Sequence, residues 1–402
     1  MKKMPFDIKV GAAREMVRPL ALLPMRGFEA MGQRVNEYLL RWTTDPESDT
    51  LLTFPGFDKN SFLIEAQCPR FGTGEAKGMI RSSVRGYDLY ILCDVTNYSV
   101  TYPMYGIQSH MSPDDHFSDL KRLIAAAGNK PHRINVIMPF LYEGRQHRRN
   151  GRESLDCAIA IQELYSLGVD NIITFDAHDP RVVNAAPLSN FESVQPIYQI
   201  LKALLKVRPN MIIDKEKAMI ISPDEGAAPR NIYFSTMLGL DMGLFYKRRD
   251  YSVIVNGRNP IVAHEYLGDS VKGKDVIVPD DILSTGDSML DLARELTQRG
   301  ANRVFLAATF ALFTQGLEAF DKAYEEGLFE LVLGTNLTYL NPELASRPWF
   351  QVVDVSKYIA LLIATLNHDA SLSRLLSPDD RITRLLERHR ARQQLEGQLK
   401  IQ

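Results

Sequence analysis

The sequence predicts an α/β protein with two similar domains, each built on a mainly parallel sheet flanked by helices. Its 402 residues suffice for about two domains, each able to bury its own core. Residues 273–300 read as a buried strand, an acidic pair, a small-residue turn and a helix. The order of helix, glycine and strand at residues 155–176 returns at residues 288–309. This repetition indicates two copies of one α/β unit.

Composition and charge are ordinary for a globular chain. The hydrophobic share is 45%, the charged share is 24%, and the formal net charge of −2 gives no reason to expect nucleic acid or a membrane as a partner. Cys68, Cys93 and Cys157 form no CxxC pair, which favours free thiols in a reducing compartment. The sequence shows neither a signal peptide nor an apolar run of about 18 residues, so we expect a cytoplasmic protein.

The first part of the chain begins with a strand at Leu20. A helix follows, in which apolar residues at 28, 31, 35, 38 and 39 share one face. Residues 43–60 have the composition of a surface loop. We expect residues 96–118 to form a loop-like insertion and a helix to cover residues 119–127.

A glycine-rich turn, Phe71-Gly-Thr-Gly-Glu75, follows a predicted strand at residues 61–66. It is not a dinucleotide fingerprint, because Lys77 stands where a third glycine would be needed. The sequence also lacks a Walker A motif, which argues against a P-loop kinase. On its own, the turn is equally consistent with a plain tight turn.

A basic cluster and a histidine follow two predicted strands. Arginines 145, 148, 149 and 152 come after the strand at residues 134–140, and His178 comes after the strand at residues 171–176. Clustered arginines usually form a solvated face, and a lone histidine at a strand end is usually only hydrogen-bonded. Arginine nevertheless suits a polyphosphate, because its planar fork offers paired donors to the oxygens.

In the second part of the chain, the strand at residues 217–222 opens into a loop that contains Asp224. Further on, Lys247-Arg248-Arg249 begins a polar stretch, which is long enough to close over a substrate. Three adjacent cations are otherwise an unremarkable solvated group.

The stretch at residues 273–300 has the strongest chemical pattern. A strand at residues 276–278 precedes Asp280 and Asp281, and a helix begins at Ser288. A small-residue turn before a helix directs backbone N–H groups at one point, which suits a phosphate. The two carboxylates could hold ribose hydroxyls or Mg²⁺. The alternative is an ordinary turn with a capping serine.

The remaining elements complete the second domain. We expect a strand at residues 303–309, a helix at residues 313–325 and a strand at residues 331–338. A further strand at residues 351–355 and a helix at residues 356–366 close the fold.

Several of these stretches together resemble one enzyme family. The segment Val278-Pro-Asp-Asp-Ile-Leu-Ser-Thr-Gly-Asp-Ser288 resembles the phosphoribosyl-pyrophosphate (PRPP) loop of the type I phosphoribosyltransferase fold. Ribose-phosphate pyrophosphokinases (PRPP synthetases) have similar motifs at the positions of residues 71–75, 142–149, 176–178, 222–230 and 244–250. The resemblance covers about residues 20–370. It implies two tandem phosphoribosyltransferase-type domains.

The resemblance also implies roles for individual residues. For ATP it implies Phe71, Glu75, Arg145 and Gln146. For ribose 5-phosphate it implies Asp280, Asp281, Ser284, Thr285, Gly286, Asp287 and Ser288. For Mg²⁺ it implies His178 and Asp224, and for catalysis Lys247 and Arg249.

Three positions depart from the family pattern. His147 replaces an aspartate, Ser284 stands where most members have aspartate, and Asp287 stands where they have glycine. A carboxylate at Asp287 would oppose a phosphate dianion unless it turns outward. We therefore expect a working but weakened sugar-phosphate site.

The activity that the resemblance implies is diphosphoryl transfer. The C1 hydroxyl of ribose 5-phosphate would attack the β-phosphorus of MgATP, giving PRPP and AMP. The nucleotide motifs fall in the first domain and the PRPP loop in the second, so we expect the site between them. A homo-oligomer, a hexamer or another dimer-based assembly, is also implied. Two alternatives stay open: a PRPP-consuming phosphoribosyltransferase and a non-catalytic regulatory paralogue.

The predicted domain organisation follows from these assignments. We expect an N-terminal extension at 1–18, a nucleotide-side domain at 19–195, a PRPP-loop domain at 196–348, a closing strand and helix at 349–372 that return to the first domain, and a polar helical tail at 373–402.

Overall fold

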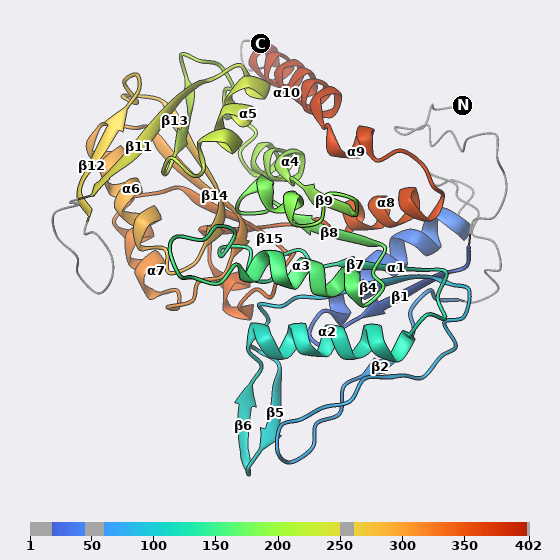
Figure 1. Cartoon of the computed structure of the whole chain (residues 1–402). Coiled ribbons are helices and arrows are strands. Elements are labelled where there is room, and N and C mark those ends of the chain that lie inside the picture. Colours follow the sequence, from blue (N-terminus) through green and yellow to red (C-terminus); the bar gives the residue numbers. More distant parts are fainter. Residues whose placement is uncertain (1–17, 45–59, 250–260, 400–402) are drawn as a thin grey trace. The chain divides into compact units, whose positions relative to one another are not determined.

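The computed structural model describes residues 18–44, 60–249 and 261–399, except for the side chains at 44, 247–249, 261–264 and 396–399 (Figure 1). The chain divides into two compact units. The first contains the chain up to Gln195 together with residues 336–339 and 354–376. The second contains residues 196–335 and 340–353 and the chain from Ser377 onward. Among the described helices, none has the length and apolar character needed to span a bilayer.

The first unit is built on a five-stranded sheet in which every neighbouring pair is parallel. Its order is β1-β4-β7-β8-β9. The strands are β1 (Leu20–Pro24), β4 (Asp88–Leu92), β7 (Arg133–Ile137), β8 (Asn171–Phe175) and β9 (Asn190–Val194). The interior strands are almost fully buried, because helices cover both faces of a parallel sheet.

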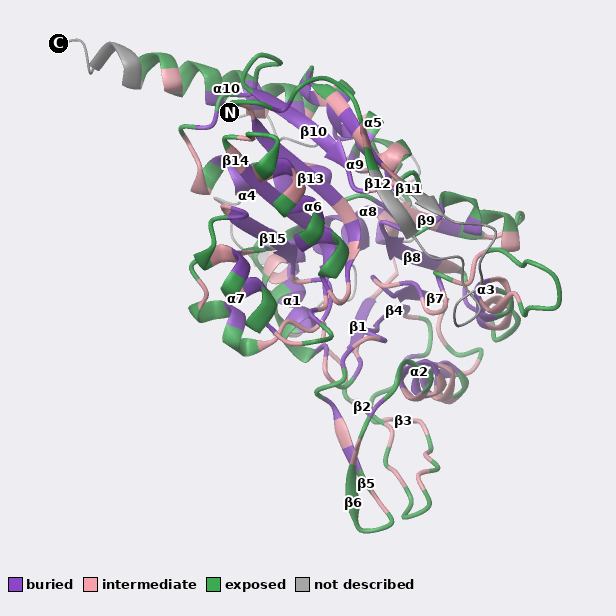
Figure 2. Cartoon of the chain, turned by 90° about the vertical axis from the view of Figure 1, so that its left-hand side faces the viewer, coloured by how far each residue is buried: buried purple, intermediate pink, exposed green. Residues whose placement is uncertain are grey.

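Helices cover the two faces of this sheet. One face carries α1 (Glu29–Thr44), which packs against α8 (Ser356–Asn367). The other carries α2 (Pro113–Ala127) and α3 (Asp156–Ser166), which share one apolar core with the strands (Figure 2). The smaller elements are η1 (Pro180–Ala185) and α9 (Ser373–Leu376).

A buried polar network fastens α8 to the sheet. The Asp88 side chain is fully buried and accepts hydrogen bonds from Arg133 Nε (3.1 Å) and Nη2 (2.9 Å). It also accepts from Asn135 Nδ2 (2.8 Å), Tyr90 Oη (3.0 Å) and, from α8, Asn367 Nδ2 (2.9 Å). A buried carboxylate is costly without partners, and the bond from Asn367 attaches the returning helix to this network.

Residues 96–118 differ from the predicted loop. They form a hairpin of β5 (Thr101–Met104) and β6 (Ile107–His110), followed directly by the first turn of α2. The hairpin turn, Tyr105-Gly106, has positive φ at both residues, as a two-residue turn of this kind requires. Beside the hairpin lies a short pair of strands, β2 (Ala66–Gln67) and β3 (Met79–Ile80).

The early start of α2 has a clear local cause. The Ser112 hydroxyl accepts from the Asp115 backbone N–H (3.2 Å), while the Asp115 carboxylate accepts from the Ser112 N–H (3.0 Å). This capping box, with Pro113 in the first turn, starts the helix six residues before the predicted position.

The second unit has a seven-stranded sheet in the order β12-β11-β10-β13-β14-β15-β16. The strands are β10 (Ala218–Ser222), β11 (Asp241–Arg249), β12 (Ile261–Leu267), β13 (Asp275–Leu283), β14 (Arg303–Ala311), β15 (Leu331–Thr335) and β16 (Phe350–Val353). All neighbours are parallel except β11 and β12.

Helices again lie on both faces. On one face, α6 (Asp287–Gln298) and α7 (Glu318–Glu325) share an apolar core with β10, β13 and β14. On the other, α4 (Ile197–Val207) packs against β15 and β16, and α5 (Ala228–Leu238) packs against β10 and β11. The C-terminal helix α10 (Asp379–Leu399) covers α4 and α5, and η2 (Pro342–Ser346) precedes β16.

Three further expectations need correction. Strand β13 continues through Asp280 and Asp281 instead of ending before them. The helix expected from residue 313 begins at Glu318, because residues 312–317 form a turn. The expected return of a strand and a helix to the first unit holds for α8 alone, because β16 pairs with β15 in the second sheet.

Candidate active site

Three carboxylates and an arginine gather in the second unit, where the parallel strands β10 and β13 end. Asp280 and Asp281 lie on β13, and Asp281 is almost fully buried. Arg230, in the first turn of α5, places Nη1 3.6 Å from Asp280 Oδ1 and 3.9 Å from Asp281 Oδ1. Burial and the Asp281 charge raise the pKa of Asp280 well above its usual range, and the Arg230 guanidinium opposes the rise.

The loop after β10 places Asp224 beside this pair. Asp224 Oδ1 accepts from the Ala227 N–H (3.1 Å), which fixes the turn that leads into α5. The Asn231 side chain then joins this turn to β13, donating to the carbonyl oxygens of Ala227 and Pro279 at 3.1 Å each. The negative charge of Asp224 adds to the raised pKa of Asp280, so the carboxylates are close enough to interact.

The predicted phosphate loop joins β13 to α6. Gly286 has φ of 92° and is the N-cap of α6, so the helix begins at Asp287, one residue earlier than predicted. A Cβ on Gly286 would lie 2.3 Å from the Phe320 ring, so glycine is needed here for both space and backbone conformation. The Ser284 carbonyl accepts from the Thr314 N–H (3.0 Å), which holds the other end of the loop.

This loop exposes the start of α6. Asp287 and Ser288 are exposed, and the helix has no side-chain cap at its N-terminus. The first N–H groups of a helix lack partners within the helix, and they attract anions. Ser284, Thr285 and Gly286 therefore lie on a loop that can bind a phosphate, while the charge of Asp287 opposes that binding.

In the first unit, His147 and His178 follow the neighbouring strands β7 and β8. Their rings lie 5.5 Å apart, and His147 Nε2 is 3.2 Å from Asp179 Oδ2. Hydrogen bonds from Arg181 hold the pKa of Asp179 down, at about 2. Burial lowers the pKa of His147, so this residue is neutral near pH 7 although it contacts a carboxylate. His147 stands where the family has an aspartate, and it contacts Asp179, which follows the neighbouring strand β8.

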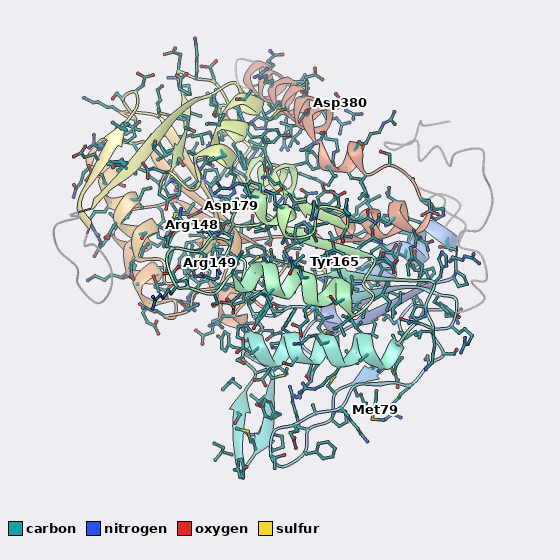
Figure 3. The ribbon with its side chains drawn as sticks, in the orientation of Figure 1. Met79, Arg148, Arg149, Tyr165, Asp179 and Asp380 are labelled. Atoms are coloured by element: carbon teal, nitrogen blue, oxygen red, sulfur yellow. The ribbon has the colours of Figure 1, made fainter. Side chains whose placement is uncertain are left out.

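The basic loop between β7 and α3 contains the predicted nucleotide residues. Arg145, Arg148 and Arg149 are all exposed. Figure 3 labels Arg148 and Arg149 on this loop. The Gln146 amide donates to the carbonyl oxygens of Arg148 (3.2 Å) and Ser154 (2.9 Å), so it shapes its own loop. Contact between the Gln146 amide and a nucleotide would require those bonds to be exchanged.

The turn with Phe71 and Glu75 lies beside the β5–β6 hairpin, on the side of α2 opposite to the sheet (Figures 1 and 2). The Phe71 N–H donates to the Glu75 carbonyl (2.7 Å), which closes the turn. The Phe71 side chain is 55% exposed, so its ring is open to solvent.

Lys247 and Arg249 lie at the end of β11, and their side chains are outside the described residues. The backbone of Lys247 pairs with that of His264 on β12, and the register shifts between Arg248 and Arg249. The polar stretch expected to close over a substrate also falls largely outside the described residues.

Two participants have no role in the expectations from sequence. Arg230 completes the Ser-Pro-Asp-x-Gly-x-x-x-Arg pattern, and its spacing from Asp224 places it in the first turn of the next helix. Asp179 is adjacent to the predicted His178 and contacts His147. Within the described part of the chain, no three His, Cys, Asp or Glu side chains are grouped as a complete metal site.

Comparison with known proteins identifies the family. Residues 21–168 match the model of the N-terminal domain of ribose phosphate pyrophosphokinase, and residues 187–332 match that of the phosphoribosyl transferase domain. The ribose-phosphate pyrophosphokinase of Pasteurella multocida is 29% identical over 327 residues, covering 78% of this chain and 92% of that protein. The one from Aquifex aeolicus is 23% identical over 320 residues, with the same coverage.

A solved structure shows the same fold. The phosphoribosylpyrophosphate synthetase from Mycobacterium smegmatis aligns with a TM-score of 0.67 at 19% identity, covering 88% of this chain and all of that one. The two tandem phosphoribosyltransferase-type domains predicted from the sequence are therefore confirmed. The chain belongs to the ribose-phosphate pyrophosphokinase family.

Proposed function

We propose that this protein transfers the diphosphoryl group of MgATP to the C1 hydroxyl of ribose 5-phosphate, giving PRPP and AMP. The observation that carries the proposal is the grouping of Asp224, Arg230, Asp280 and Asp281 next to the loop that leads into α6. This grouping supplies acceptors for ribose hydroxyls and, at the helix N-terminus, donors for a phosphate.

The sugar phosphate would be held in two parts. The 5-phosphate would lie against the loop from Ser284 to Ser288, where it accepts hydrogen bonds from backbone N–H groups. Asp280 and Asp281 would accept hydrogen bonds from the ribose hydroxyls. Arg230 would keep the two carboxylates from repelling each other before the sugar arrives.

The nucleotide would be held by residues of the first unit. Phe71 offers an exposed ring for the adenine, Glu75 an acceptor for its amino group, and Arg145 and Gln146 donors for the phosphates. Lys247 and Arg249 would stabilise the negative charge that develops during transfer. Phosphoryl transfer depends on such positioning and neutralisation more than on a strong base.

Mg²⁺ suits the donor set that these residues supply. Asp224 offers a carboxylate, and Mg²⁺ prefers carboxylate, phosphate and water oxygens, with few protein ligands. His178 is exposed and would contact the ion through water, because imidazole is a poor direct ligand for Mg²⁺. When bound, the ion neutralises the phosphate oxygens and orients the β-phosphorus.

Two observations favour this activity over the alternatives. A PRPP-consuming phosphoribosyltransferase has no need of the pyrophosphokinase N-terminal domain, which covers residues 21–168 here. A non-catalytic regulatory paralogue could lose these three carboxylates, whereas Asp224, Asp280 and Asp281 are all present.

We propose further that the active form is a homo-oligomer, which light scattering of the purified protein would test.

The reaction products provide a direct test. Purified protein is incubated with ATP, Mg²⁺ and ribose 5-phosphate, and the nucleotides are separated by chromatography. We expect AMP and PRPP in equal amounts, formed only when ribose 5-phosphate is present. The appearance of ADP, or AMP formed without the sugar phosphate, would contradict the proposal. Consumption of added PRPP with a free base would instead identify a phosphoribosyltransferase.

A further inference from the structure

The β5–β6 hairpin contacts the Phe71–Glu75 turn at the tip of the turn and at its base. At the tip of the turn, the Tyr105 N–H donates to the Gly72 carbonyl (3.3 Å). Next to it, Met104 packs on Gly74 so closely that a Cβ there would lie 2.7 Å from the methionine Sδ. Gly74 has φ of 94°, so the turn has a glycine where both the backbone and the neighbouring side chain require one.

At the base of the turn, the hairpin and α2 hold Arg70. Its guanidinium lies 4.7 Å above the centre of the Tyr102 ring, on β5. It also forms an ion pair of 2.9 Å with Asp119, on α2. Only 6% of the Arg70 side chain is exposed, so this contact is a buried one with a fixed geometry. Arg70 thus joins the residue before Phe71 to both neighbouring elements.

The hairpin has its own small core. Val100, Tyr102 and Met111 are buried together, and Met104 packs against them. A two-stranded hairpin is marginal alone, but this one is fastened at its base by that cluster and by the start of α2. The hairpin is therefore held by side-chain packing as well as by its own two strands.

We infer that the β5–β6 hairpin is a positioning element for the nucleotide. It holds the Phe71–Glu75 turn in one conformation, so that the exposed Phe71 ring and the Glu75 carboxylate are presented to the adenine together. This inference rests on the proposed function, because the contacts of Phe71 and Glu75 with ATP are part of that proposal. A turn without this support samples other conformations, and the apparent affinity for ATP falls with the fraction of time that it spends in the competent one.

Met104 provides the test, with two control variants on the same hairpin. Met104→Ala removes the side chain that packs on Gly74, while Met104→Leu nearly conserves its volume. Ile107→Ser changes an apolar residue of β6 that is 65% exposed. For each variant, hydrogen exchange of residues 69–77 is measured by mass spectrometry, together with ATP binding by equilibrium dialysis and the kinetic constants.

For Met104→Ala we expect faster hydrogen exchange at residues 69–77. We also expect an apparent KM for ATP that is ~3- to 10-fold higher, because the turn would spend only between a third and a tenth of its time in the conformation that binds ATP. The kcat and the KM for ribose 5-phosphate should stay within about 2-fold, because no group at the sugar or at the reacting atoms is changed. Met104→Leu and Ile107→Ser should behave like the unmodified protein.

Unchanged exchange at residues 69–77 in Met104→Ala would overturn the inference, as would faster exchange without weaker ATP binding. An equal rise in both KM values would also overturn it, because that pattern indicates general loosening. If the unmodified protein makes no PRPP, the proposed function fails on its own assay. The exchange and ATP-binding measurements would still decide the role of the hairpin.

Discussion

Arg230 Nη1 lies 3.6 Å from Asp280 Oδ1, between the two carboxylates of β13. The arginine comes from the first turn of α5, and both its side chain and Asp281 are at most 9% exposed. Burial and the charge of Asp281 raise the pKa of Asp280, and the Arg230 guanidinium opposes that rise without cancelling it. The charged form of the Asp280 carboxylate is therefore disfavoured in the folded protein.

Asp280→Asn should therefore stabilise the protein at pH 8 while it impairs sugar binding. The folded-state pKa of Asp280 is raised, so the folded chain binds the proton more tightly than the unfolded chain does. The stability of the unmodified protein thus falls as the pH rises from the ordinary aspartate pKa of about 3.9 through the raised value.

The gain from Asp280→Asn should accordingly be largest at pH 8 and should shrink at pH 5. Urea unfolding at both pH values measures the gain in the free energy of unfolding. Asp291→Asn, at a side chain that is 65% exposed, is the matched control and should change little. A loss of stability in Asp280→Asn at pH 8 would show that Arg230 already compensates for the second charge.

Lys247→Ala should lower kcat by roughly 10²-fold or more, the scale of losing one preorganised charge contact. Arg249→Ala should be comparable. Arg248→Ala should be milder, since successive residues of a strand point to opposite faces. Lys247 is better compared with Arg248 than Arg249 is. The pairing register of β11 shifts between Arg248 and Arg249, so the regular alternation of side chains does not extend across that step. Equal losses at Lys247 and Arg248 would indicate general electrostatics rather than placed groups.

Asp224→Asn and His178→Ala should each raise the Mg²⁺ concentration needed for the half-maximal rate. Asparagine keeps an oxygen that can accept from the Ala227 N–H, so the turn is preserved while the charge is removed. Glu225→Gln removes a charge from the neighbouring exposed residue and serves as the control. Rates measured over a range of Mg²⁺ at saturating ATP decide the outcome. An unchanged Mg²⁺ dependence in both variants would remove these residues from the metal site.

Asp287→Asn should lower the KM for ribose 5-phosphate by roughly 3- to 10-fold, because it removes a like charge from the helix end at which we propose that the phosphate binds. Asparagine is chosen because it leaves the size of the side chain and the first turn of α6 nearly unchanged. Glu295→Gln, in the same helix but near its C-terminus, is the control. A higher KM in Asp287→Asn would mean that the carboxylate itself is a ligand.

The elements with long apolar patterns were predictable from sequence. The helix at α1, the strands β7, β8, β10 and β14, and the helices α3 and α6 all lie within a few residues of their expected positions. Parallel strands buried on both faces read as short apolar runs, and such runs are hard to misplace. The family motifs likewise led to the residues that meet around Arg230.

The failures have local causes. The hairpin at residues 101–110 has few apolar residues in alternation, and its Tyr-Gly turn is not a common signal, so the sequence predicts a loop there. The capping box at Ser112 is visible in the sequence but falls within that predicted loop. The sequence also predicts that the strand ends before Asp280 and Asp281, because acidic residues rarely continue a buried strand. Here Arg230, which is distant in sequence, lies near both carboxylates and allows the strand to continue through them.

The return of α8 to the first sheet affects how the chain can fold during synthesis. The bond from Asn367 to Asp88 joins residues 279 positions apart, and α8 covers a face of the first sheet beside α1. The ribosome completes α8 only after nearly the whole second unit has been made. Until then, the apolar face that α8 covers stays open and Asp88 lacks one of its donors. The N-terminal half, expressed alone as residues 1–195, should therefore aggregate or require a chaperone, and a separately supplied peptide of residues 354–376 should rescue it.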